Sequence, residues 1–355
     1  MMKVISVANN KGGIGKSITA MSLAYVAANE FNKKVLFIDM DSQSSSSIVL
    51  GVTPYLYDSR TPFQNIPELI KRLDNEDLSY EIDYLDGEDD EEIEDDKYVT
   101  GIHTIFDKMI EEKNQFCLTK ELIESCIHKP YYILKEAKKK NGKYVKDKNG
   151  SVVYESVKYS YGFDVMPSTE YLSDIQIDWG SEAVCGKTIH QMRGQQLAVV
   201  IDFICKNYPE YWDVCIIDTP PSLDLLSANA IYASVDGVII PCSGDKQSLY
   251  SLARIKRTIR IVKNQRKGHL GALGIVLTIF NEKRVVDKYI SKTVGKDTKL
   301  RVFNTRISET TDAKKAILSG LILPQINRKN YEENCALFKE IENAIDEGRK
   351  REEGK

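Results

Sequence analysis

The stretch Val4-Ile5-Ser6-Val7-Ala8-Asn9-Asn10-Lys11-Gly12-Gly13-Ile14-Gly15-Lys16-Ser17 decides how the rest of this chain is organised. Val4 to Ala8 is a short apolar run, typical of a strand that is buried on both faces. A glycine-rich turn follows, and Ile18 to Asn29 then carries apolar residues at helical spacing. Glycines let a backbone approach an anion closely, and the amides of a helix N-terminus point toward it with the positive end of the helix dipole. The stretch therefore predicts a loop that binds the phosphates of a nucleotide, with Lys16 on the β- and γ-phosphates and the Ser17 hydroxyl on magnesium.

Three aspartates follow apolar runs elsewhere in the chain. Val35 to Ile38 leads into Asp39 and Asp41, and Val214 to Ile217 leads into Asp218. A strand, a helix and a second strand within about forty residues form a βαβ unit, which implies a parallel sheet whose ligands lie beyond the carboxyl ends of the strands. Phosphoryl transfer to water needs magnesium and a group that orients the water. We predict Asp218 near the metal, Asp41 at the water and Asp39 as a further metal candidate, the alternative for each being a helix cap or turn.

Length and composition fit one globular α/β domain over residues 1–355. Hydrophobic residues make up 42% of the 355 positions and charged residues 28%, and no apolar run approaches the roughly 20 residues that cross a bilayer. Seven cysteines without Cys-x-x-Cys spacing indicate reduced thiols and a cytoplasmic location. The four histidines show no metal-ligand spacing, which argues against a metalloenzyme.

The net charge of −3 hides a strong asymmetry along the chain. Residues 74–96 contain 14 acidic and no basic residues, whereas 246–329 contain 20 Lys and Arg against 5 Asp and Glu, a net charge of +15. Such a basic half attracts a phosphate backbone, and together with the glycine loop it favours contact with nucleic acid over the alternative of a solvated lysine-rich surface. We interpret 72–100 as an acidic loop and 134–160 as a basic hairpin, both inserted at the surface of the domain.

Several motifs together resemble one protein family. Lys11-Gly12-Gly13-Ile14-Gly15-Lys16-Ser17 resembles the deviant Walker A motif of the ParA/MinD group of ATPases, in which the first lysine is the signature lysine. Asp39-Met40-Asp41-Ser42-Gln43 resembles switch I of that group, and Ile217-Asp218-Thr219-Pro220-Pro221-Ser222 resembles its Walker B motif with switch II. Leu277 to Asn281 and Val302 to Ile307 are similar to the ParA/Soj partition proteins in particular.

This resemblance implies a P-loop NTPase fold, with a mostly parallel twisted sheet flanked by helices. It implies ATP and Mg²⁺ as cofactors, a homodimer with two nucleotides at its interface, nonspecific DNA and a ParB-like partner that stimulates slow hydrolysis, in the cytoplasm and on the nucleoid. Lys11 then acts across the dimer, Lys16 acts within its own subunit, and Asp41 assists the water. Nucleotide contacts are expected from Lys11, Gly12, Gly13, Ile14, Gly15, Lys16, Ser17, Ile18 and Asn281, and metal contacts from Ser17, Asp39 and Asp218.

The chain departs from the family in the region where the resemblance implies DNA contacts. The family often has Pro-Arg-Ser after its last strand, but this chain has Ser308-Glu309, and Glu309 is expected to repel phosphates. The residues predicted to contact DNA are Arg254, Arg257, Arg260, Arg306, Lys314 and Lys315.

Three rival functions follow from the same sequence. A MinD-like membrane protein needs an apolar face near its C-terminus, which Gly348 to Lys355 does not offer, so we expect no membrane partner. An iron–sulfur ATPase needs paired cysteines, and Cys126, Cys185 and Cys242 are isolated. The third alternative remains open: a nucleotide-switched scaffold that positions a protein cargo instead of DNA.

Overall fold

The computed structural model describes residues 1–52, 99–112, 116–140, 143–146, 151–169, 171–181 and 194–354. The acidic run 74–96, and with it nearly all of the predicted 72–100 insertion, lies outside these ranges.

A seven-stranded parallel sheet forms the centre of the molecule, in the order β11-β10-β9-β1-β8-β2-β7. The strands are β1 (Lys3–Val7), β2 (Val35–Asp39), β7 (Asp164–Met166), β8 (Val214–Asp218), β9 (Val238–Cys242), β10 (Ala272–Phe280) and β11 (Val302–Ser308). Strands β2, β8 and β9 are buried at every position, which explains why their sequences are continuous apolar runs and not alternating ones. The predicted fold class is confirmed.

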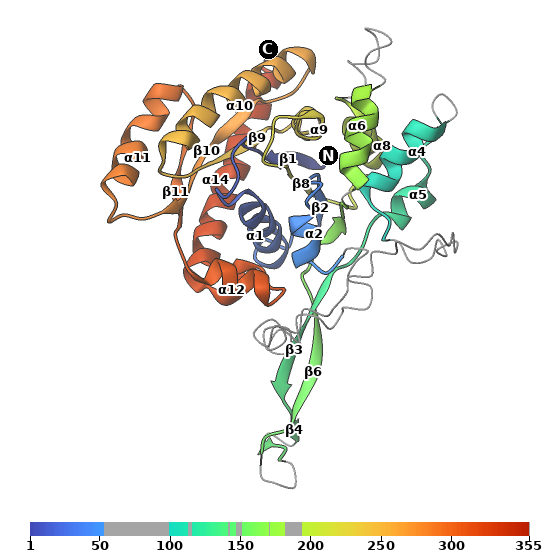
Figure 1. Ribbon diagram of the computed structural model, residues 1–355, viewed down its shortest axis with the longest axis vertical. Coiled ribbons are helices and arrows are strands. Elements are labelled where there is room, and N and C mark those ends of the chain that lie inside the picture. The colour runs from blue at the N-terminus through green and yellow to red at the C-terminus, as the bar shows by residue number, and fades with distance from the viewer. Residues whose placement is uncertain are drawn as a thin grey trace, which may run out of the picture.

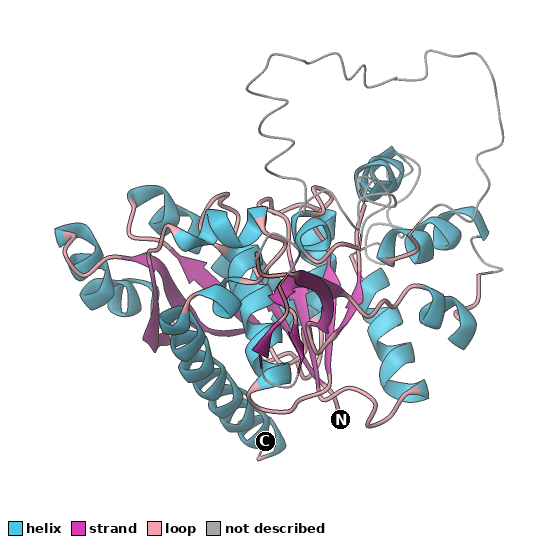
Figure 2. Cartoon of the chain, turned by 90° about the horizontal axis from the view of Figure 1, so that it is seen from below, coloured by secondary structure: helices cyan, strands magenta, loops and turns pink. Residues whose placement is uncertain are grey.

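Helices cover both faces of this sheet (Figure 2). One face carries α1 (Lys16–Asn29) and α14 (Arg328–Glu353), with α2 (Ser45–Val49), α12 (Asp312–Leu318) and α13 (Leu323–Ile326) beside them. The other face carries α4 (Ile102–Glu112), α5 (Lys120–Ser125), α6 (Tyr171–Ser181), α8 (Gln196–Asn207), α9 (Leu225–Ala233), α10 (Lys246–Gln265) and α11 (Val285–Thr298). Among the described residues, no helix combines the length and the apolar composition that crossing a membrane requires.

Both edge strands of the sheet form hydrogen bonds with groups outside the sheet. At the β11 edge, the carboxylate of Glu340 accepts hydrogen bonds from the backbone amides of Asn304 and Thr305, at 2.7 and 2.8 Å. Glu333 accepts from the amide of Ser308 at 2.9 Å. At the β7 edge, the backbone of Val165 pairs in both directions with that of one residue, His128.

A two-stranded arm extends away from the body below α2 and α12 (Figure 1). It consists of β3 (Tyr131–Ala137) and β6 (Tyr154–Ser160), paired antiparallel, and continues to β4 (Lys139–Lys140) and β5 (Lys143–Tyr144) near its tip. The segment predicted as a basic hairpin thus contains paired strands that begin at Tyr131, three residues before the predicted boundary. The expected turn at Asn149-Gly150 lies outside the described residues.

Candidate functional site

The glycine loop between β1 and α1 forms an open cradle at the carboxyl end of the sheet. Gly13 and Gly15 have φ values of +72° and +81°, which only glycine adopts without strain. A Cβ placed on either one would meet no described atom within 4 Å, so the space above the loop is open. The carbonyl of Ile14 accepts a hydrogen bond of 2.7 Å from the Thr278 hydroxyl on β10, which anchors the loop to the sheet. Shape and backbone geometry therefore fit the phosphates of a nucleotide.

Lys16 lies at the first position of α1 and is almost completely buried, with 7% of its surface exposed. Its ammonium donates a hydrogen bond of 3.0 Å to the carbonyl of Lys11, across the mouth of the loop. Burial lowers the pKa of Lys16, and the nearby charges of Asp218 and Asp41 oppose this effect. Additional negative charge, such as that of phosphates, would favour its charged form.

Two buried carboxyl groups lie opposite each other where β2 and β8 end. Asp39 and Asp218 are partners in the strand register, and both are fully buried. Burial is the largest cause that raises the pKa of each carboxyl above its ordinary value. Asp218 accepts hydrogen bonds from the hydroxyl of Ser46 at 2.7 Å and also from that of Ser17, at the start of α1. A carboxylate and a hydroxyl that meet at a phosphate cradle are ligands that Mg²⁺ prefers.

Asp39, also predicted at the metal, has a different set of contacts. One of its oxygens accepts from both the amide and the hydroxyl of Ser47, at 2.9 and 2.7 Å, and the other accepts from the amide of Asp41 at 3.0 Å. All three donors belong to the turn that follows β2 and to helix α2. Asp39 thus shapes this turn, and its contact with a metal stays a prediction.

Asp41 lies in the same turn and is 5% exposed. Its carboxylate accepts from the amide of Gln43 at 3.0 Å, and its backbone carbonyl accepts from the Ser168 hydroxyl. Burial raises the pKa of Asp41, whereas the charge of Lys16 lowers it. The structure therefore brings Asp41 within electrostatic reach of Lys16, beside the cradle.

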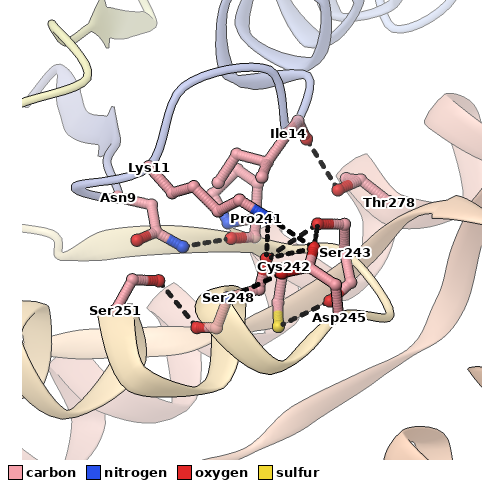
Figure 3. Close-up of polar contacts among 10 residues, drawn as sticks. All are labelled: Asn9, Lys11, Ile14, Pro241, Cys242, Ser243, Asp245, Ser248, Ser251 and Thr278. Atoms are coloured by element: carbon pink, nitrogen blue, oxygen red, sulfur yellow. Dashed lines mark hydrogen bonds and ion pairs between the residues drawn. The ribbon is translucent and has the colours of Figure 1, made fainter. Parts of the chain in front are cut away.

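Lys11 is held by the loop that leads from β9 into α10 (Figure 3). Its ammonium lies 2.5 Å from the carboxylate of Asp245 and 3.2 Å from the hydroxyl of Ser248. Asp245 also caps α10, because its second oxygen accepts from the amide of Ser248 at 3.0 Å. Partial burial by itself raises the pKa of Asp245, but the hydrogen bonds from Lys11, Ser243 and Ser248 outweigh it and hold the pKa well below its usual range. We call this contact between Lys11 and Asp245 the lysine latch.

A cleft of about 510 Å³ opens beside the lysine latch. Its walls are the loops that follow β9 and β10, and they meet at Gly244, where a Cβ would lie only 1.7 Å from an oxygen of Asp287. Two exposed apolar side chains, Val285 and Val286, also line it, at 80% and 53% exposure. The cleft therefore combines charged and apolar lining residues.

Asn281, predicted to face the adenine, follows β10 and is engaged locally. Its side-chain amide donates to Glu309 at 3.1 Å, and its side-chain oxygen accepts from the amide of Lys283 at 3.0 Å. The guanidinium of Arg284 donates hydrogen bonds to the two carboxylate oxygens of Glu309, at 2.7 and 2.8 Å. The expected repulsion of phosphates by Glu309 is thus offset by a neighbouring cation.

The chain matches a known protein family along most of its length. Residues 5–323 match the family described as the CobQ/CobB/MinD/ParA nucleotide binding domain. The chain belongs to this family. The chromosome partitioning protein ParA of Caulobacter vibrioides is 24% identical over 324 residues, which cover 89% of this chain and 86% of that protein. The sporulation initiation inhibitor protein Soj of Bacillus subtilis is 25% identical over 343 residues, which cover 96% of this chain and 98% of that protein.

Solved structures of this family share the fold. McdA of Cyanothece in its apo form is similar with a TM-score of 0.60 and 20% identity, covering 97% of this chain and all of that chain. A protein of Borrelia burgdorferi B31 is described as a plasmid partition protein and is bound to AMPPNP. It has a TM-score of 0.55 and 22% identity, and the match covers 97% of this chain and 98% of that chain. The cobyrinic acid a,c-diamide synthase of Mycobacterium smegmatis, bound to ADP and magnesium, has a TM-score of 0.54 and 18% identity, covering 92% of each chain.

No three His, Cys, Asp or Glu side chains of the described ranges gather closely enough to hold a metal ion on their own. A family member that binds magnesium between a hydroxyl, a carboxylate and nucleotide phosphates needs no such cluster. The donor set of Ser17 and Asp218 is consistent with that arrangement.

The residues predicted to contact DNA lie on two faces of the sheet. Arg254, Arg257 and Arg260 are exposed along α10. Arg306 is exposed on β11, and its guanidinium stacks 4.7 Å from the ring centroid of Phe280, on the same face as α10. Lys314 and Lys315 are exposed on α12, on the opposite face. The structure does not gather all six into one patch.

Sequence reasoning missed the serines and the aspartate that hold this site together. Ser46 and Ser47 bind the two buried aspartates, and Asp245 holds Lys11 from 234 residues away. A signal was present in the run Ser44 to Ser47 directly after switch I, and in an aspartate before a long helix, which is a common N-cap.

Proposed function

We propose that this protein is a ParA-type ATPase, which closes into a dimer on ATP, binds DNA nonspecifically and moves a plasmid or chromosome with a ParB-like partner. The observation that carries this proposal is the position of Lys11. It lies at the outer lip of the phosphate cradle and lines an open cleft, and its ammonium pairs with Asp245, whose side chain is 43% exposed. Nothing in the cradle itself needs this second lysine, and family membership supports a task outside its own subunit.

Each residue of the site has a chemical task in this proposal. Backbone amides of residues 12–18 bind the phosphates, and the ammonium of Lys16 moves from the Lys11 carbonyl to the phosphate oxygens. Ser17 and Asp218 are the groups that would hold Mg²⁺, which neutralises phosphate charge when bound. The carboxylate of Asp41 orients the attacking water, held in place by the turn that Asp39 organises.

The exposed cleft supports the proposed dimer. Val285 and Val286 leave apolar surface in solvent next to the cradle, and a second copy would bury it. In this dimer the ammonium of Lys11 leaves Asp245 and contacts the phosphates of the partner's nucleotide, where a positive charge stabilises the developing negative charge. A slow basal rate, raised by the partner protein, is expected for such a switch, and so is a location in the cytoplasm on the nucleoid.

A scaffold that positions a protein cargo is the second candidate. It uses the same nucleotide switch, and the separation of the basic side chains of α10 and α12 onto two faces favours it over one continuous DNA surface. The two candidates differ in whether the ATP-bound dimer retains DNA.

Retention of DNA by an Asp41→Ala variant tests the proposal. With ATP, this variant is expected to accumulate as a dimer that holds nonspecific duplex DNA, with an affinity that falls steeply as salt is raised, and to release it with ADP or without nucleotide. Asp202→Ala, at an exposed aspartate on α8, is the matched control and should hydrolyse ATP and release DNA like the unmodified protein. DNA binding that is absent, or indifferent to nucleotide, would reject the partition function in favour of the cargo scaffold. An unchanged hydrolysis rate would reject the role given to Asp41.

A further inference from the structure

The two-stranded arm is joined to the hydrophobic core by a continuous row of aromatic rings. Phe37 on β2 is fully buried, and its ring centroid lies 6.1 Å from that of Phe163. The row continues to Tyr161 at 6.0 Å, to Tyr132 at 5.0 Å and to Tyr159 at 5.5 Å. The last two rings stack across the arm, because Tyr132 and Tyr159 are register partners of β3 and β6.

The base of the arm is also fixed by hydrogen bonds. The hydroxyl of Tyr161 is buried and donates to the carbonyl of Gly320, just beyond α12, at 2.5 Å. Backbone hydrogen bonds persist toward the tip, where the amide of Lys138 donates to the carbonyl of Val153 at 2.8 Å and that of Val145 donates to the carbonyl of Lys138 at 2.8 Å. Such anchoring gives the arm a defined direction relative to the body (Figure 1).

The arm carries an excess of positive charge on this framework. Residues 131–160 contain eight lysines and three acidic residues, a net charge of +5, and no arginine. Lys139, Lys146 and Lys158 are exposed. Two of them lie over tyrosine rings: the ammonium of Lys158 is 3.4 Å from the centroid of Tyr131, and that of Lys139 is 5.1 Å from the centroid of Tyr144. These aromatic contacts keep the ammonium groups at defined places on the arm.

We propose that the arm binds the phosphate backbone of duplex DNA and is a principal DNA-contacting element of this protein. The proposal rests on the proposed function, because it names the surface that performs its DNA binding. It also adds a site that the motif residues do not include: of the predicted DNA contacts, only Lys314 and Lys315 lie near the arm, on the helix whose end is tied to Tyr161.

Three features favour duplex DNA over an acidic protein as the occupant. A two-stranded antiparallel ribbon has the width that the major groove of B-DNA admits. Lysines bind phosphates as point charges, whereas the arm has no arginine, the residue that forms paired hydrogen bonds with the carboxylates of an acidic protein. Tyr144 and Tyr154 expose 56% and 61% of their surface on the outer half of the arm, where their hydroxyls can donate to phosphate oxygens.

A triple substitution tests the proposal in the full-length protein with ATP. Lys139→Gln, Lys146→Gln and Lys158→Gln together remove three charges without adding bulk. The matched control is the triple variant Lys108→Gln, Lys120→Gln and Lys206→Gln. It removes three exposed lysines, one each from α4, α5 and α8. One of them, Lys120, also lies over a tyrosine ring, with its ammonium 5.4 Å from the centroid of Tyr208. Binding of a fluorescent duplex of random sequence is measured from low to moderate salt, together with ATP-dependent dimerisation.

The arm variant is expected to dimerise normally but to bind DNA at least about tenfold more weakly, with the slope of log affinity against log salt reduced by about 2 to 3. The control variant is expected to retain the slope of the unmodified protein. An arm variant with an unchanged slope, while the unmodified protein binds DNA only with ATP, would overturn the arm proposal and leave the partition function standing. Absence of DNA binding by the unmodified protein with ATP would overturn both.

Discussion

Asp245→Asn should strengthen the ATP-dependent dimer, because it weakens the lysine latch in the free subunit. In the proposed dimer, Lys11 leaves Asp245 to contact the phosphates of the partner's nucleotide, so that closure requires each subunit to break the latch. Asparagine removes the negative charge but keeps a side-chain oxygen that can cap α10 through the amide of Ser248. The substitution therefore changes the latch with little effect on the helix.

The expected size of the effect follows from the exposure of the two side chains. Lys11 and Asp245 retain 22% and 43% of their side-chain surface in solvent, so we assign the ion pair the energy of a partly exposed one, about 0.5 to 1 kcal/mol. A dimer contains two latches, which gives a total of about 1 to 2 kcal/mol and a dissociation constant lower by about 5- to 30-fold.

Sedimentation equilibrium with a nonhydrolysable ATP analogue measures this constant directly. Asp202→Asn is the control for a change of one charge, because Asp202 pairs with Arg266 at 3.0 Å on the surface of α8. A double-mutant cycle with Lys11→Met separates the latch from general electrostatics, since Asp245→Asn should have no effect once Lys11 is absent. A dimer of unchanged or lower affinity in the single variant would refute the latch as a barrier to closure.

Three further outcomes are expected. Lys16→Ala should abolish nucleotide binding in an equilibrium titration, and retained affinity would contradict the cradle. Gly244→Ala should lower the free energy of unfolding by about 1 to 3 kcal/mol in urea, because its Cβ would lie 1.7 Å from Asp287, whereas Gly194→Ala, with no described neighbour within 4 Å, should cost far less. Burial lowers the pKa of His103 to about 4 from 6.5, so its contribution to stability is complete above pH 6.5 and is lost as the pH falls toward 4. The free energy of unfolding should therefore fall by about 2 kcal/mol less in His103→Phe than in the unmodified protein when the pH is lowered from 7 to 5. Equal losses of unfolding free energy in the two proteins would contradict this assignment.

Local patterns were sufficient to predict the sheet and the cradle. The apolar runs before Asp39 and Asp218 predict buried parallel strands, and their register then places both carboxyl groups beside the glycine loop. These features depend on residues close together in the chain, or on a rule that all parallel strands share.

Contacts across long sequence distances could not be predicted in the same way. The partner of Lys11 depends on the order of β1 and β9 in the sheet, which no local pattern encodes. A strand-end aspartate such as Asp39 has the same sequence pattern whether it binds a metal or organises a turn. The donors that engage Asp39, supplied by Ser47 and Asp41, are seen only in the structure. The charge balance at Glu309 likewise depends on Arg284, which a tertiary loop brings beside it.

The closed edges of the sheet limit how copies of this chain can associate. Three backbone amides of β11 already donate to the carboxylates of Glu333 and Glu340, and β7 has three residues, one of them paired with His128. Neither side invites β-strand addition, the usual route to filaments and aggregates. The proposed dimer instead assembles at the loop-rich end where the phosphate cradle opens, and there the contact between subunits can depend on the bound nucleotide.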